Sequence, residues 1–129
     1  MEVYSGVKSQ PCRNAPMLRR FLFAKIRDIK LTGTNLEYQG SITLDEAYLE
    51  QSGILPGEEV DVVNLENGVR LTTYAIKGKR GSGIVELNGP AARCGCAGDR
   101  VMVLSYCSLT PDEIPGHTPR VFSALPVKE

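Results

Sequence analysis

Residues 59–74, which read EVDVVNLENGVRLTTY, contain the clearest fold signal in this chain of 129 residues. Glu59–Val63 and Arg70–Tyr74 show partial alternation of polar and apolar side chains, which is typical of strands that bury one face. Asn67-Gly68 lies between the two runs, and this dipeptide favours the turn of a β-hairpin. The stretch therefore predicts two neighbouring antiparallel strands.

Short runs with strand character continue on both sides of this hairpin. Residues 18–31 are rich in apolar and basic side chains and predict extended structure with a bend. Many short strands with little helix predict a mainly β protein that closes into a small barrel, because closure removes exposed strand edges. The remaining strands are expected over Leu36–Gln39, Ile42–Leu44, Glu59–Leu65, Val69–Ile76, Gly83–Leu87, Arg100–Cys107 and Arg120–Ala124.

Two short helices are expected as well. Thr43 or Asp45 provides the side-chain oxygen of a typical helix N-cap, and Ser52-Gly53 is a typical stop signal. Pro111 is followed by two acidic residues, which predicts the start of a second helix.

The length indicates one domain with a single modest core. Residues 1–16 contain two prolines, many small polar residues and no periodicity, and they predict a flexible N-terminal extension. Met17 is an alternative start of the chain, and residues 17–129 are expected to form the folded domain.

The charges of the chain balance, with 15 basic Lys and Arg residues against 15 acidic Asp and Glu residues. A net charge of zero gives no field that would draw the protein to nucleic acid or to an anionic membrane, so neither partner is expected. No apolar run approaches the length of a membrane span, and the first residues lack the pattern of a signal peptide. A cytoplasmic location is therefore expected.

The cysteines and the single histidine do not indicate a metal site. Cys94 and Cys96 are separated by one residue, which fits neither a zinc ribbon nor a redox motif. His117 is the only histidine, so a histidine-based triad is not expected either. Reduced thiols are the simpler interpretation.

Gly40-Ser41 has the composition that self-cleavage requires. Attack of the Ser41 hydroxyl on the Gly40 carbonyl would give an ester, and glycine enters the strained backbone that this needs without a Cβ penalty. β-Elimination would then cut the chain and leave dehydroalanine, which hydrolyses to a pyruvoyl group able to accept electrons in a decarboxylation. Ser82 also follows a glycine, and most such pairs are ordinary turns, so the dipeptide alone does not decide between the two.

Several segments, in the same order along the chain, resemble the pyruvoyl-dependent aspartate 1-decarboxylase family. The resemblance covers about Met17 to Phe122 and implies a six-stranded double-psi β-barrel that assembles as a homotetramer. It also implies decarboxylation of L-aspartate to β-alanine and carbon dioxide, which feeds pantothenate and coenzyme A synthesis. The segments that carry it are Lys25, Leu36–Asp45, Asn67–Tyr74, Lys79–Gly83, Leu87–Arg93 and Gly98-Asp99.

The resemblance assigns roles to residues by position. Cleavage between Gly40 and Ser41 is expected to turn Ser41 into the covalent pyruvoyl cofactor, and Tyr74 is expected to protonate the carbanion left after decarboxylation. Thr73 is expected to assist the backbone rearrangement and to touch substrate. The expected substrate-binding residues are Lys25, Arg70, Thr73, Asn88, Gly89, Pro90 and Ala91.

Three departures from the family pattern lie close to this site. Arg27 stands where the family commonly has histidine, and Asp28 stands where it has arginine. Pro90 replaces a more usual alanine and removes one backbone N–H. A pyruvoyl decarboxylase of another acidic amino acid and an unprocessed binding module stay open as alternatives, as does a requirement for a maturation helper protein.

Overall fold

The computed structural model describes residues 17–38 and 40–124. The flexible extension predicted over residues 1–16 lies outside the described residues, as do Gln39 and residues 125–129. Within the described residues, no helix is long and apolar enough to cross a membrane.

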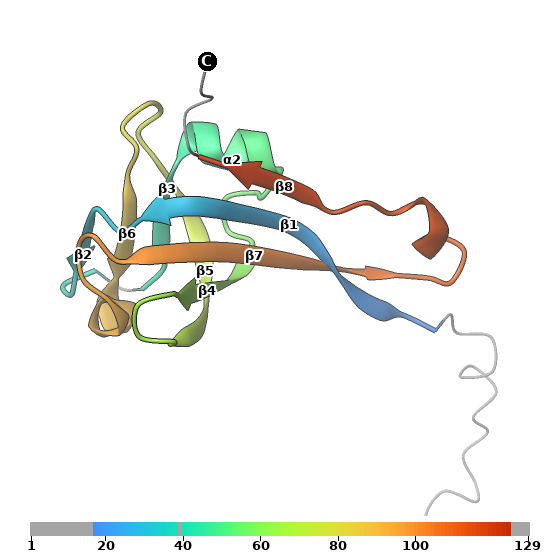
Figure 1. The fold of residues 1–129 in the computed structure, drawn as a ribbon, viewed down its shortest axis with the longest axis horizontal. Helices are drawn as coiled ribbons and strands as arrows, with labels where there is room; N and C mark the ends of the chain where they lie inside the picture. The colour runs from blue at the N-terminus through green and yellow to red at the C-terminus, as the bar shows by residue number, and fades with distance from the viewer. Residues whose placement is uncertain (1–16, 39, 125–129) are drawn as a thin grey trace, which may run out of the picture.

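The described chain is mainly β, as the sequence predicts, and its strands form one hydrogen-bonded sheet (Figure 1). One α-helix and two 3-10 helices connect the strands. The elements are β1 (Arg19–Lys30), β2 (Gly33–Asn35), β3 (Ile42–Asp45), α2 (Glu46–Ser52), β4 (Glu59–Asn64), β5 (Arg70–Gly78), β6 (Val85–Asn88), η1 (Gly89–Cys94), β7 (Arg100–Leu109), η2 (Ile114–Gly116) and β8 (Arg120–Ser123).

The strand order of the sheet is β2-β6-β3-β5-β4-β7-β1-β8. The short strands β2 and β8 lie at its two ends, so six strands lie between them, which is the number that the family resemblance implies. Thr32, between β1 and β2, donates its N–H to the Val85 carbonyl of β6 at 2.8 Å, next to the parallel pairing of β2 with β6. This arrangement is consistent with a small β-barrel.

The hairpin predicted by residues 59–74 is confirmed, and its loop is longer than a two-residue turn. β4 and β5 pair antiparallel, with Val63 opposite Arg70. Gly68 has a φ of 75° and donates its N–H to the Asn64 carbonyl at 2.9 Å. Asn64 also anchors the loop, because its Oδ1 accepts the N–H of Glu66 at 2.8 Å.

β1 and β7 form a long antiparallel ribbon, and β8 runs parallel to β1 on its other edge (Figure 1). The bend predicted in residues 18–31 is confirmed by a bulge between Ile26 and Ile29. Asp28 lies in this bulge with a φ of 62°, a left-handed conformation that is uncommon for residues with a Cβ.

Two of the predicted elements are wrong. Residues 36–38 form a turn rather than a strand, because the Asn35 side chain accepts the N–H of Glu37 at 3.1 Å and turns the chain. Residues 111–113 form a turn that leads into η2 rather than an α-helix. Pro115 lies inside η2 and lacks the N–H that a continuing helix would need.

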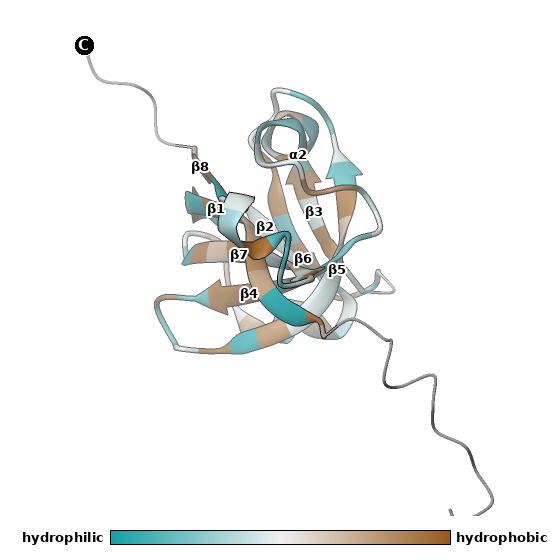
Figure 2. Cartoon of the chain, turned by 90° about the vertical axis from the view of Figure 1, so that its right-hand side faces the viewer, coloured by the Kyte–Doolittle hydropathy of each residue, from teal (hydrophilic) through white to brown (hydrophobic). Residues whose placement is uncertain are grey.

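The core is built mainly from apolar residues of the strands and of α2, and the strands include hydrophobic segments, coloured brown in Figure 2. β4 shows the alternation that the sequence predicts, with Val60 and Val62 buried. The buried residues of the core cluster are Ala24, Ile26, Ile29, Leu31, Ile42, Leu44, Leu49, Ile54, Val60, Val62, Ala75, Val85, Leu87, Val101 and Val103.

Asp45 caps α2, as predicted, and also holds the loop that precedes β6. Its buried carboxylate accepts backbone N–H groups from Ala47 at 2.8 Å, Gly81 at 3.0 Å and Gly83 at 2.8 Å. Burial raises the pKa of Asp45, but the three N–H hydrogen bonds outweigh it and hold the pKa below its ordinary value.

We expect Asp45→Ala to lower the free energy of unfolding by about 2–4 kcal/mol at neutral pH, because three hydrogen bonds to a charged group are lost. Since the folded pKa is lowered, this stabilisation is present above about pH 4 and is lost as the pH falls further. Thermal unfolding at pH 7 and pH 3 tests this. The difference in melting temperature between the variant and the wild type should be smaller at pH 3 than at pH 7. Asp112→Ala, which removes an exposed carboxylate, is the matched control. An equal gap at both pH values would contradict the role of the ionised carboxylate.

Candidate active site

Ser41 lies between the turn of residues 36–38 and strand β3, and it is fully buried. Gly40 has a φ of 131° and Ser41 has a φ of 104°. A positive φ costs about 1–3 kcal/mol for a residue with a Cβ, so the backbone is strained at the predicted nucleophile. An added Cβ on Gly40 would meet no atom within 4 Å, so backbone conformation, not lack of space, favours glycine there.

Asn88, at the end of β6, holds both the backbone and the side chain of Ser41. Its N–H donates to the Ser41 carbonyl at 2.9 Å, and its Nδ2 donates to Ser41 Oγ at 2.9 Å. Nδ2 also donates to Thr43 Oγ1 at 2.8 Å. Asn88 is therefore in direct contact with the predicted nucleophile. From the sequence, Asn88 is expected only in the substrate pocket, and no local sequence pattern indicates this contact.

A cavity of about 480 Å³ opens beside Ser41. This volume is within the range of typical small-molecule sites. The cavity brings together Ser41, Thr73, Tyr74, Pro90 and Ala91, all of which are predicted from the sequence as site residues. The complete lining is Gly40, Ser41, Leu71, Thr72, Thr73, Tyr74, Pro90, Ala91 and Cys94.

The sheet explains why Ser41 and Tyr74 are neighbours. β3 pairs parallel with β5, and Ile42 lies opposite Ala75. Ser41 precedes Ile42 and Tyr74 precedes Ala75, so Ser41 and Tyr74 lie at the same end of the two paired strands. Tyr74 is 42% exposed, so its ring lies at the mouth of the cavity rather than in the core.

The turn from β6 into η1 forms another wall. Gly89 is buried with a φ of 63°, a conformation that glycine adopts without strain. Pro90 lies in the first turn of η1, where a missing N–H does not interrupt a helical hydrogen bond. The departure at Pro90 therefore fits the local backbone.

The structure does not bring Arg70 and Lys25 into the cavity of Ser41. Arg70 lies in a second cavity of about 510 Å³, which shares only Thr72 with the first. Its Nη2 donates to Asp61 Oδ2 at 3.2 Å and to the Tyr106 hydroxyl at 2.6 Å. The side chain thus reaches across β4 towards β7, away from β3.

Lys25 lies in a third cavity of about 420 Å³, together with three more cations, Arg27, Lys30 and Arg100. It faces Leu104 in a cross-strand row that continues to Asp61 and Thr72. Lys25 and Thr72 are therefore three strand spacings apart, a distance of about 14 Å measured across the sheet.

The two departures beside Lys25 pair with one another. Arg27 Nε donates to Asp28 Oδ2 at 3.0 Å, and the Ser123 hydroxyl donates to the same oxygen at 2.6 Å. The hydrogen bond from Ser123, opposed by desolvation and assisted by the Arg27 charge, lowers the pKa of Asp28. Arg27 and Asp28 therefore add no net charge around Lys25.

Known proteins resemble this chain over most of its length. The profile of the family described as aspartate decarboxylase matches residues 17–125. An aspartate 1-decarboxylase of Acaryochloris marina is 56% identical over 105 residues, which are 81% of this chain and 80% of that protein. One from Exiguobacterium sibiricum is 51% identical, with 81% and 83% of the two chains covered. Aspartate 1-decarboxylase 2 of Gloeobacter violaceus is 53% identical, with 81% and 84% covered. The chain belongs to the aspartate decarboxylase family.

Proposed function

We propose that this chain is a pyruvoyl-dependent enzyme that decarboxylates L-aspartate to β-alanine and carbon dioxide, in the cytoplasm, for pantothenate and coenzyme A synthesis. One observation carries the proposal from the residues: Ser41 has a strained backbone, is held by Asn88, and lines a cavity with Thr73 and Tyr74. Family membership supports the same chemistry independently.

The first step is cleavage of the chain by Ser41. Its Oγ attacks the Gly40 carbonyl carbon, the peptide C–N bond breaks, and the Ser41 nitrogen takes up a proton. Strain at Gly40 and Ser41 raises the energy of the uncut chain, and Asn88 fixes the Oγ. Loss of the Ser41 α-proton then breaks the ester, so that fragment 1–40 leaves with a Gly40 carboxylate. Water replaces the remaining nitrogen, which departs as ammonia.

The residues around position 41 fit a pyruvoyl group. The group would begin the second fragment at the wall of the 480 Å³ cavity, and the Oδ1 of buried Asn88 beside it has no hydrogen-bond partner among the described residues. When present, a pyruvoyl group supplies a carbonyl that binds the substrate amine and accepts the electrons released with carbon dioxide.

In this proposal, Tyr74 supplies the proton that replaces carbon dioxide. Its position at the cavity mouth lets the phenol reach substrate and exchange its proton with solvent. A phenol is a weak acid, so it gives up its proton to a strongly basic carbon rather than to water. Thr73 lies beside it on β5 and lines the same cavity, where its hydroxyl can contact both the cleaved backbone and substrate.

Substrate carboxylates need cations. Among the described residues that line the cavity of Ser41, none is Lys or Arg, whereas Arg70 and Lys25 line neighbouring surface cavities. We infer that a second copy places its cationic cavity of Lys25, Lys30 and Arg100 over the cavity of Ser41, within a homotetramer. Arg70, close to Thr72 on β5, then binds a carboxylate from the side of its own chain.

Ser41→Ala is expected to leave a single uncut chain, because no hydroxyl remains to attack Gly40. Intact-mass measurement of the purified wild type should show fragments 1–40 and 41–129, and the second fragment should resist Edman sequencing because a pyruvoyl group has no free amine. A free serine amine at position 41 would indicate simple hydrolysis instead. A single full-length wild-type chain would favour a binding module.

Tyr74→Phe is expected to cleave normally but to form β-alanine about a hundred- to ten-thousandfold more slowly, the usual contribution of a positioned acid. Phenylalanine keeps the ring, so the strand and Ser41 should be unaffected. Mass measurement and β-alanine formation on the same sample test this. Glutamate assayed beside aspartate tests the preference between acidic amino acids. Wild-type turnover in a fully cleaved variant would remove Tyr74 from the catalytic residues.

Co-expression tests the shared site. Ser41→Ala and Lys25→Ala chains should each be inactive alone, and a mixed assembly should recover part of the wild-type activity. A site with Ser41 from one variant and Lys25 from the other would have both residues intact. Activity that stays absent in purified mixed assemblies would place Lys25 outside the site of a neighbouring copy.

A further inference from the structure

The guanidinium of Arg70 is already bound to a carboxylate of its own chain. Its Nη2 lies 3.2 Å from Asp61 Oδ2 and 2.6 Å from the Tyr106 hydroxyl. Asp61 is fixed in turn, because the Thr72 hydroxyl donates to its Oδ1 at 2.7 Å. These hydrogen bonds join neighbouring strands β5, β4 and β7, so Asp61 is presented to Arg70 by the sheet itself.

The Nη2 atom is the part of the guanidinium that a substrate carboxylate needs. A carboxylate binds arginine in a two-bond fork through Nη1 and Nη2 or through Nε and Nη2, so both arrangements use an N–H of Nη2. The two N–H groups of Nη2 are directed at Asp61 and Tyr106. A forked substrate carboxylate therefore has to displace one of these two partners.

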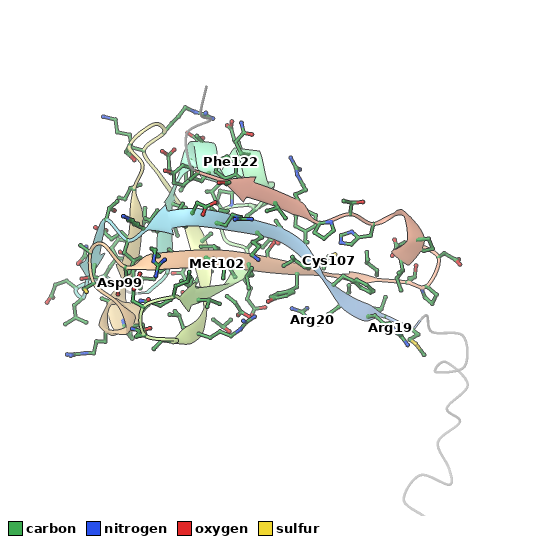
Figure 3. All side chains as sticks on the ribbon, in the orientation of Figure 1. Arg19, Arg20, Asp99, Met102, Cys107 and Phe122 are labelled. Carbon is green, nitrogen blue, oxygen red and sulfur yellow. The ribbon has the colours of Figure 1, made fainter. Side chains whose placement is uncertain are left out.

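Charge makes Asp61 the stronger competitor. Tyr106 is neutral, whereas Asp61 neutralises the guanidinium, and its side chain is 20% exposed against 54% for Arg70. Among the residues that the structure describes, the surrounding cavity is lined by the carboxylates of Glu58, Glu59 and Asp61 and by two guanidinium groups, those of Arg70 and Arg20. Arg20 lies over the Tyr106 ring at 5.5 Å, on the part of the β1–β7 ribbon near Cys107 (Figure 3).

We propose that Asp61 is a specificity-determining residue, whose carboxylate occupies Arg70 until a substrate carboxylate replaces it. This rests on the proposed function, in which Arg70 binds a carboxylate of aspartate. Asp61 sets how tightly acidic substrates bind and takes no part in the chemical step. The exchange of one carboxylate for another keeps the guanidinium paired throughout, so that an amino acid without the second carboxylate gains nothing from displacing Asp61.

Asp61→Asn tests the proposal, because asparagine keeps the shape and the acceptor for Thr72 but loses the charge. The KM for aspartate should fall about two- to fivefold, the size expected for release of one partly exposed ion pair, while kcat stays unchanged. A KM that is unchanged or raised would overturn the proposal. A merely structural role of Asp61 would lower kcat or thermal stability instead.

Glu59→Gln is the matched control. It removes one carboxylate from the same cavity, and no hydrogen bond or ion pair joins Glu59 to Arg70 in the described part of the chain. An equal fall in KM for Glu59→Gln would assign the effect to the general charge of the cavity and would overturn the specific role of Asp61. In an Arg70→Ala background, adding Asp61→Asn should leave the KM unchanged, since no guanidinium remains to be released.

Succinate binding separates this proposal from the proposed function. Succinate has two carboxylates but no amine, so calorimetry of its binding does not depend on turnover. Tighter binding of succinate to Asp61→Asn than to wild type supports the role of Asp61, even if neither protein makes β-alanine. A lack of β-alanine formation would contradict only the proposed function. Equal or weaker binding overturns the role of Asp61, whatever the activity of the wild type.

Discussion

The pair of backbone and side-chain hydrogen bonds between Asn88 and Ser41 is the constraint on which the site depends. One residue at the end of β6 holds the carbonyl of Ser41 with its N–H and the hydroxyl of Ser41 with its amide. A serine with a positive φ is costly, and it persists only where surrounding contacts determine it. These contacts come from β6, which pairs antiparallel with β3 and brings Asn88 beside Ser41.

The rest of the fold serves this arrangement. β3 lies between β6 and β5, so the strand that follows Ser41 is paired on both sides, and both pairings restrain its backbone. β5 contributes Thr73 and Tyr74 to one wall of the cavity, and η1 contributes Pro90 and Ala91 to another. β5 also carries Arg70, whose guanidinium binds the carboxylate of Asp61 on the neighbouring strand β4. Thr73 and Tyr74, which line the cavity of Ser41, thus lie on the same strand as Arg70, which pairs with Asp61.

Much of the fold could be predicted from local patterns, since alternation in β4, the Asn67-Gly68 turn and the cap at Asp45 are short-range features. The failures at residues 36–38 and at Pro111 have the same origin. The Asn35 side chain turns the backbone by accepting a hydrogen bond from Glu37, and Pro115 stops a helix because it has no N–H to donate. Each local effect outweighs the structural propensity of the neighbouring residues.

The site was only partly predictable for a different reason. Gly40-Ser41 and Tyr74 could be chosen from residue chemistry and family resemblance, but the contact of Asn88 with Ser41 spans 47 residues and depends on strand register. Arg70 was predicted as a substrate-binding cation from family resemblance, but its pairing with Asp61 and Tyr106 depends on the placement of three strands together. The pairing register of strands that are distant in the sequence cannot be predicted from local sequence patterns alone.

The central claim is that the protein carries a ketone at position 41, and a carbonyl reagent tests it most directly. Purified protein treated with phenylhydrazine and measured by mass spectrometry should show one adduct, on the fragment that begins at residue 41, and Ser41→Ala should show none. An unmodified fragment 41–129, or an adduct that persists in Ser41→Ala, would contradict the account.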